Sequence, residues 1–302
     1  MPTGRQALSR DSAVITALSR DIAEMEVAMS EWETVEGEHW AEYAEHYTRM
    51  LAPYGEAVLA AAAPQPGERV IDVGCGNGDL SLLAAVAVGP DGVVQGVDLS
   101  PAEVAVASRR STEAGLSAAR FAVADAARIE VDAPYDVLVS RFGVMFFDDP
   151  TGAFSHLRSL LRPGGRIAFA CWQELFANEW MIVPGGAVAS VLGLPGGNSG
   201  GPGPFSLADP DLTRQMLTAA GFVDIDVEPV AAALWMGADA DAAVEFMTRT
   251  GMGRILFGDA APEQRAEAIE RARDALRPHE TDSGVMLDGA AWVVTATNPP
   301  TP

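Results

Sequence analysis

Lysine is absent from this sequence of 302 residues. All 20 basic residues are arginine, and 42 Asp and Glu residues give a formal net charge of −22. Nucleic acids and anionic membranes are bound by clusters of Lys and Arg, and the densest basic pair here is Arg109-Arg110. We therefore expect no nucleic-acid partner and no membrane partner, and we attribute the acidity to solubility. Because the sequence lacks lysine and is rich in Ala and Gly, we favour a bacterial source.

Cysteine is scarce as well. Cys75 and Cys171 are the only two, and no C-x-x-C occurs, so neither a disulfide framework nor a metal site is expected. The first six residues lack the charged-then-apolar pattern of a signal peptide, and no apolar run is long enough for a membrane span. These absences predict a cytoplasmic protein. The hydrophobic fraction of 48% is enough for one large core, or for a core with a cap.

Residues 69–80, Arg-Val-Ile-Asp-Val-Gly-Cys-Gly-Asn-Gly-Asp-Leu, carry the strongest signal in the chain. They read as an apolar strand, a glycine-rich turn and the start of a helix. Glycine permits positive φ and close approach of a ligand, and the turn leaves N–H groups at the helix N-terminus unpaired. A dinucleotide site uses G-x-G-x-x-G, whereas the spacing here is Gly74-x-Gly76-x-Gly78. Asp72, just before the turn, would repel a pyrophosphate but favours an ammonium or a sulfonium.

This D-x-G-x-G-x-G pattern resembles motif I of the class I S-adenosylmethionine-dependent methyltransferases. Three further features recur in the same order: an acidic residue ending the next strand, an Asp at the end of the third, and Leu161-Arg162-Pro163-Gly164-Gly165 before the fifth. The resemblance covers residues 65–172 and, less closely, 205–230. Within the family, residues 51–63 and 140–147 are most similar to the ubiquinone- and menaquinone-biosynthesis type.

Strand and helix patterns alternate after Pro64-Gln65-Pro66-Gly67, which predicts an α/β fold with a parallel sheet. The resemblance implies a Rossmann-like doubly wound sheet of order 3-2-1-4-5-7-6, with strand 7 antiparallel. We divide the chain into an N-terminal helical lid, 1–63, and a methyltransferase domain, 64–302, with insertions at about 173–208 and 231–289. The expected strands are 69–73, 93–97, 120–123, 135–140, 166–172, 222–230 and 290–296. Helices are expected at 79–88, 100–114, 151–161 and 209–220, with two more in 238–277.

Asp98 ends the second strand, where a carboxylate can accept hydrogen bonds from both hydroxyls of a ribose. Ser100 already serves as the N-cap of the next helix, so capping does not account for Asp98. The resemblance implies that Asp125 accepts the adenine amino group and that the N–H of Ala126 meets a ring nitrogen. The full set of expected cofactor-binding residues is Asp72, Gly74, Cys75, Gly76, Gly78, Asp98, Leu99, Asp125, Ala126, Ser140 and Arg141.

The segment from Ser140 to Phe147 follows the fourth strand and is rich in Met and Phe. Ligands of doubly wound sheets bind at the carboxyl ends of strands, so this run could line the slot for the methyl group and its acceptor, or simply pack under the next helix. Arg141 either binds an acidic substrate or pairs with a nearby aspartate such as Asp148, and we favour the ion pair.

A polar stripe precedes the glycine-rich segment. His39, Tyr43, His46, Tyr47 and Met50 share one helical face by spacing. They form either a buried aromatic stripe or a lid over a small-molecule site, with His39 or His46 as a base. A helical pattern in residues 1–33 predicts an accessory helix, and the Gly/Pro-rich segment 193–204 predicts an irregular connection.

These features lead us to expect transfer of a methyl group from S-adenosylmethionine to a small organic molecule, by a protein that could form a homodimer. The acceptor and its methylated atom stay open. Two alternatives are a nicotinamide-dependent oxidoreductase, disfavoured by the glycine spacing and Asp72, and a non-catalytic protein that binds S-adenosylmethionine. Methyl transfer needs an aligned acceptor in a dry pocket and a base only for some acceptors, so no catalytic residue is named beyond the two histidines.

Overall fold

The computed structural model describes residues 33–193, 202–258 and 260–300. The helical pattern expected in residues 1–33 and most of the Gly/Pro-rich segment therefore lie outside the described residues. The strands are β1 (Arg69–Val73), β2 (Val93–Asp98), β3 (Ala119–Val123), β4 (Tyr135–Arg141), β5 (Leu161–Trp172), β6 (Val223–Gly237), β7 (Glu280–Thr281) and β8 (Gly284–Thr297). The α-helices are α3 (Val35–Glu42), α4 (Ala44–Ala62), α5 (Asp79–Val88), α6 (Pro101–Glu113), α7 (Pro150–Ser159), α8 (Glu179–Leu192), α9 (Pro210–Ala219), α10 (Ala240–Arg249), α11 (Gly251–Phe257) and α12 (Pro262–Leu276). Three short 3₁₀ helices are η1 (Gly143–Phe146), η2 (Leu175–Ala177) and η3 (Arg277–His279).

The strands form one sheet in the order β3-β2-β1-β4-β5-β8-β6, and the short β7 pairs only with β8. The strands from β3 to β5 pair in parallel, and β8 is antiparallel to both of its long neighbours. The expected strand order is therefore confirmed, with β8 as the seventh long strand. A parallel sheet is covered on both faces, and accordingly the central strands β1 and β4 are runs of buried Val, Ile and Leu.

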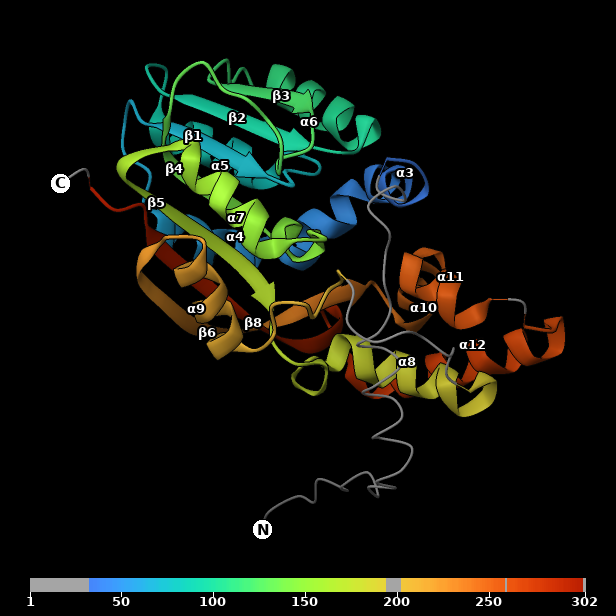
Figure 1. Ribbon diagram of the computed structural model, residues 1–302. Helices are drawn as coiled ribbons and strands as arrows, with labels where there is room; N and C mark the ends of the chain where they lie inside the picture. The colour runs from blue at the N-terminus through green and yellow to red at the C-terminus, as the bar shows by residue number, and fades with distance from the viewer. Residues whose placement is uncertain (1–32, 194–201, 259, 301–302) are drawn as a thin grey trace, which may run out of the picture.

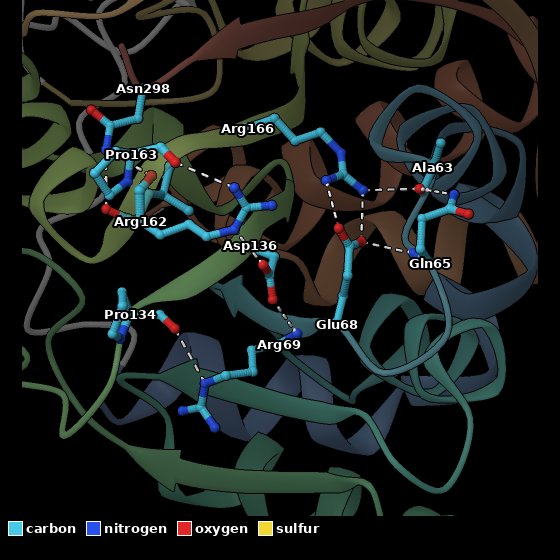
Figure 2. A network of polar contacts seen from close by, with 11 residues as sticks. Ala63, Gln65, Glu68, Arg69, Pro134, Asp136, Arg162, Pro163, Arg166 and Asn298 are labelled. Atoms are coloured by element: carbon cyan, nitrogen blue, oxygen red, sulfur yellow. Dashed lines mark hydrogen bonds and ion pairs between the residues drawn. The ribbon is translucent and has the colours of Figure 1, made fainter. Parts of the chain in front are cut away.

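Helix α4, which precedes the glycine-rich segment, packs on the sheet. It contacts β4, β5, β6 and β8, and α5 lies beside it (Figure 1). Its side chains Tyr54 and Val58 are fully buried. Arg166 of β5 holds its C-terminal end by donating from Nε to the Ala62 carbonyl at 2.6 Å. The same guanidinium donates to the Ala63 carbonyl at 2.9 Å and pairs with Glu68 at 2.8 Å (Figure 2). This network fixes α4 at the edge of the sheet where the parallel strands begin.

The outer strands are longer than the sequence predicts. β6 runs on to Gly237 and β8 begins at Gly284, and the two pair along this whole extension. Between them lie three helices where two were expected, because Thr250 ends α10 and starts α11 by accepting the Gly253 N–H at 3.0 Å. We call α8, α10, α11 and α12 the cap; its helices pack on one another beside the sheet (Figure 1). No helix among the described residues has the length and apolarity to span a membrane.

Two glycine backbones meet where β1 and β4 end. Gly74, with φ +64°, lies so close to the η1 segment that an added Cβ would stand 2.7 Å from Gly143 Cα. Gly67 has a similar φ of +82°, but nothing lies within 4 Å of the corresponding Cβ position. Comparing Gly67 with Gly74 therefore separates the cost of a left-handed backbone from the added cost of a steric clash.

We predict that Gly67→Ala lowers the free energy of unfolding by about 1–2 kcal/mol, the cost of a side chain in the left-handed region. Gly74→Ala should lose more, at least about 3 kcal/mol, because the two loops must also move apart. Urea unfolding of both variants measures the difference. Equal losses would mean that the loops separate easily.

Candidate functional site

One cavity opens at the carboxyl ends of the parallel strands, under α3 and the cap. Most of the expected cofactor-binding residues line it, namely Asp72, Gly74, Cys75, Gly76, Asp98, Leu99, Asp125, Ala126 and Arg141. Gly78 and Ser140 do not lie in its wall. Ser140 is buried and donates from Oγ to the Val73 carbonyl at 2.7 Å, and Gly78 is the left-handed N-cap of α5. Both residues support the glycine-rich turn from outside the cavity wall.

Asp98 is held by two backbone amides. One carboxylate oxygen accepts the Gly76 N–H and the other accepts the Ser100 N–H, each at 2.9 Å. Burial raises the pKa of Asp98 above its ordinary value, against the effect of these amides. The β2 carboxylate and the glycine-rich loop are thus fixed as one unit. Asp125 is similarly tied to its own turn, accepting the Ala127 N–H at 2.9 Å.

Glu103 is a site residue that the sequence analysis missed. Its N–H donates to Ser100 Oγ at 3.2 Å, one half of a capping box. The other half does not form, because Asp98 has taken the Ser100 N–H. The Glu103 side chain, 1% exposed, lines the cavity instead, and its Oε1 has no partner among the described residues. Burial, and then the charge of Asp98, raise its pKa well above the usual range.

Two more buried acceptors without partners surround the glycine-rich loop. Asp72 accepts the Ser81 hydroxyl at 2.6 Å with Oδ2, but its Oδ1 has no partner among the described residues. Asn77 donates from Nδ2 to the Trp40 carbonyl at 3.0 Å, and its Oδ1 is likewise unsatisfied. Buried acceptors are normally hydrogen-bonded, so these atoms call for a ligand that brings donors or positive charge.

Arg141 forms an ion pair with a nearby aspartate, as expected. Its partner is Asp79, 3.0 Å away, and not the example Asp148. Asp79 is also contacted by Arg110 of α6 at 2.7 Å and by the Thr48 hydroxyl of α4 at 2.8 Å. Burial alone would raise the pKa of Asp79, but the two arginines outweigh it, so the pKa is lowered. Asp79 therefore stays charged and ties α4, α5, α6 and β4 together.

The polar stripe is gathered against the cap. His39 contacts the Tyr47 hydroxyl with Nε2 at 3.0 Å, and His46 stacks on Phe246 of α10 with ring centroids 3.6 Å apart. Burial lowers the pKa of each histidine to about 4. Neither histidine lines the cavity, whereas Tyr47 and Trp40, stacked at 3.5 Å, do. The histidines are neutral packing residues here, and a role for either as a base stays a prediction.

Helix α3 crosses the cavity between the glycine-rich loop and the cap. Asn77 holds its Trp40 carbonyl, and its Glu36 pairs with Arg254 of α11. It also packs against α6. Within the described part of the chain, no group of His, Cys, Asp or Glu is arranged to hold a metal ion.

Asp72 generates a pH-dependent prediction. Burial raises the pKa of Asp72 from 3.8 to about 7, so the folded state favours the protonated carboxyl. The stability that this preference contributes is lost as the pH rises from about 4 through 7. From about pH 4 to about pH 8, the free energy of unfolding should fall by roughly 4 kcal/mol relative to Asp72→Asn, which cannot ionise. Urea unfolding of both ligand-free proteins across this range tests it. Parallel curves would show that the carboxylate ionises without penalty.

Comparison with known proteins agrees with this geometry. A methyltransferase domain model matches residues 64–182. Trans-aconitate 2-methyltransferase of Methylobacterium radiotolerans is 30% identical over 246 residues, which is 76% of this chain and 87% of that protein. Aklanonic acid methyltransferase DauC of Streptomyces sp. is 36% identical over 121 residues, 40% of this chain. The match spans only about half the length of the first relatives, 55% of DauC and 48% of an uncharacterized protein of Mycobacterium tuberculosis.

Solved structures support the fold. Phosphoethanolamine N-methyltransferase 2 of Haemonchus contortus, in complex with S-adenosyl-L-methionine, superposes with a TM-score of 0.54 at 18% identity, covering 91% of this chain and 60% of that chain. At this identity the likeness shows the fold alone. The sequence identity across 87% of trans-aconitate 2-methyltransferase, the domain match and the strand order together show that the chain belongs to the class I S-adenosylmethionine-dependent methyltransferase family.

Proposed function

We propose that the protein transfers the methyl group of S-adenosylmethionine to a small organic acceptor. The observation that carries this proposal is the ring of buried, unsatisfied acceptors around the glycine-rich loop, Asp72 Oδ1, Asn77 Oδ1 and Glu103 Oε1. The donor molecule fits such a wall, because it carries an ammonium, a sulfonium, two ribose hydroxyls and an adenine amino group. Its sulfonium supplies a methyl group that is already activated for transfer.

Each end of the donor has residues suited to hold it. Asp98, oriented by the Gly76 and Ser100 amides, would accept the ribose hydroxyls. Asp125 and the Ala126 N–H would bind the adenine. Asp72 would face the positively charged end, where its ionised form is favoured. The remaining task of the chain is to align the acceptor and exclude water, and α3 with the cap would close over the cavity for this purpose.

The alternatives are weaker. A nicotinamide dinucleotide would place its pyrophosphate beside Asp72 and Glu103. Arg141, the one arginine among the described residues that line the cavity, is already paired with Asp79. A non-catalytic protein that binds S-adenosylmethionine would have the same cofactor site, so only the methylation of an acceptor distinguishes the enzyme from it. The names of the relatives do not agree on one acceptor. The narrower resemblance to ubiquinone-type enzymes, the division at residue 63, the cytoplasmic location and a homodimer stay predictions.

The first test is ligand choice. S-adenosylmethionine and S-adenosylhomocysteine should raise the melting temperature, as any ligand selective for the folded state does, and NAD should not. Stabilisation by NAD alone would overturn the proposal. A labelled-donor screen that finds any methylated small molecule would then exclude the non-catalytic alternative.

Asp98→Ala should weaken donor binding about 30- to 1000-fold, since removing a charge-assisted contact to two hydroxyls costs about 2–4 kcal/mol. Asp91→Ala is the matched control, because Asp91 is exposed in the turn after α5 and lies outside the cavity wall. Isothermal titration with S-adenosylhomocysteine measures both variants. Unchanged affinity in Asp98→Ala would remove this carboxylate from the donor site.

A further inference from the structure

Part of the cavity wall, which we call the apolar half, is made by the end of β5, by η1 and by the cap. The described residues that line the cavity in this part are almost all apolar, although Glu36 of α3 lies beside the cap and pairs with Arg254 of α11. Five methionines from five parts of the chain line the cavity: Met50, Met145, Met181, Met236 and Met247. Thioether side chains adapt to irregular apolar surfaces, so this wall can accommodate a broad apolar molecule.

Two tryptophans give the apolar half a fixed aromatic surface. Trp172 stacks on Phe142 with ring centroids 4.0 Å apart and an interplanar angle of 10°. Trp180 of α8 lies 4.9 Å from Trp172, tilted by 44°. The indole N–H of Trp180 donates to Asn178 Oδ1 at 2.9 Å. The buried Asn178 side chain in turn donates from Nδ2 to the carbonyls of Gln173 and Glu174, which lie between β5 and η2. Phe142 covers one face of Trp172, which is 4% exposed, so the half-buried ring of Trp180 offers the larger aromatic surface to a ligand.

Among the described residues, the cavity wall offers no cation that is free of a carboxylate partner. Arg141 is the only basic residue in this described wall, and its guanidinium is held 3.0 Å from Asp79, a carboxylate that it shares with Arg110. Arg254 of α11 is paired with Glu36. An acceptor carboxylate in this half would lose its hydration, would have to compete with Asp79 for Arg141, and would face the carboxylates that line the same cavity.

We propose that the acceptor is a neutral, flat molecule of fused aromatic rings, bound against Trp172 and Trp180 in the apolar half of the cavity. This inference rests on the proposed function, because it treats that half as the acceptor site of a methyltransferase. Such a site would select among small organic acceptors by charge and shape, and it would exclude acceptors that carry a carboxylate and acceptors that are small and polar.

The test uses two probes with the same ring system, hydroxyphenanthrene, which is neutral, and phenanthrene carboxylate, which is anionic. Equilibrium dialysis against the full chain saturated with S-adenosylhomocysteine should give at least about tenfold tighter binding of the neutral probe. Trp180→Ala should weaken the neutral probe roughly 10- to 100-fold and leave S-adenosylhomocysteine affinity within about twofold. Trp235→Ala, on β6 outside the cavity wall, is the matched control and should change neither.

A third variant tests the charge argument. Asp79→Asn leaves Arg141 without its carboxylate, so the preference for hydroxyphenanthrene over phenanthrene carboxylate should become smaller. An unchanged ratio of the two affinities in a folded variant would contradict the charge argument. Equal or tighter binding of the anionic probe, binding of neither probe, or indifference to Trp180→Ala would overturn the acceptor class while the donor titration still stood. Failure of S-adenosylhomocysteine to bind the wild-type chain would instead overturn the proposed function itself.

Discussion

A single buried carboxylate, Asp79, fixes the relation between the parts of the site. It receives Arg141 from β4, Arg110 from α6 and a hydroxyl from α4. Removing this carboxylate would leave the Arg141 guanidinium, 12% exposed, without its counter-charge, which costs far more than an exposed ion pair contributes. The same pairing bears on the charge of the cavity, because Arg141 lines it and shares this one carboxylate with Arg110. The glycine-rich loop lies directly before Asp79 and is thereby anchored to α4, to α6 and to the end of β4.

The cavity combines two opposite environments. Around the glycine-rich loop, burial raises the pKa of Asp72, Asp98 and Glu103, so that a bound cation would favour their ionised forms. Around Trp172 and Trp180 the wall is apolar. Under our proposals, a positively charged donor would be stabilised at one end and a neutral acceptor would be desolvated at the other. The reacting atoms would then meet at the boundary, where water is excluded and a loss of charge on the donor is least opposed.

The sequence predicts the inner part of this fold well. β1 and α5 occur at the expected residues because glycines and acidic residues mark their limits. The extensions of β6 and β8 could not be predicted, since each depends on pairing with a strand some fifty residues away. The partner of Arg141 was missed for the same reason. Glu103 looked like part of a local capping box, and only the tertiary contact of Asp98 with the Ser100 amide releases it into the cavity.

The cap enters the chain at two places only, after β5 and between β6 and β8, and the matched domain model ends at residue 182, within α8. Helices α10 to α12 therefore lie outside the stretch that the domain model matches, whereas Trp172, η1 and the start of α8 lie inside it. The acceptor side that we propose is thus built partly from the shared domain and partly from the segment between β6 and β8. The long pairing of β6 with β8 joins this segment to the same sheet that carries the glycine-rich loop.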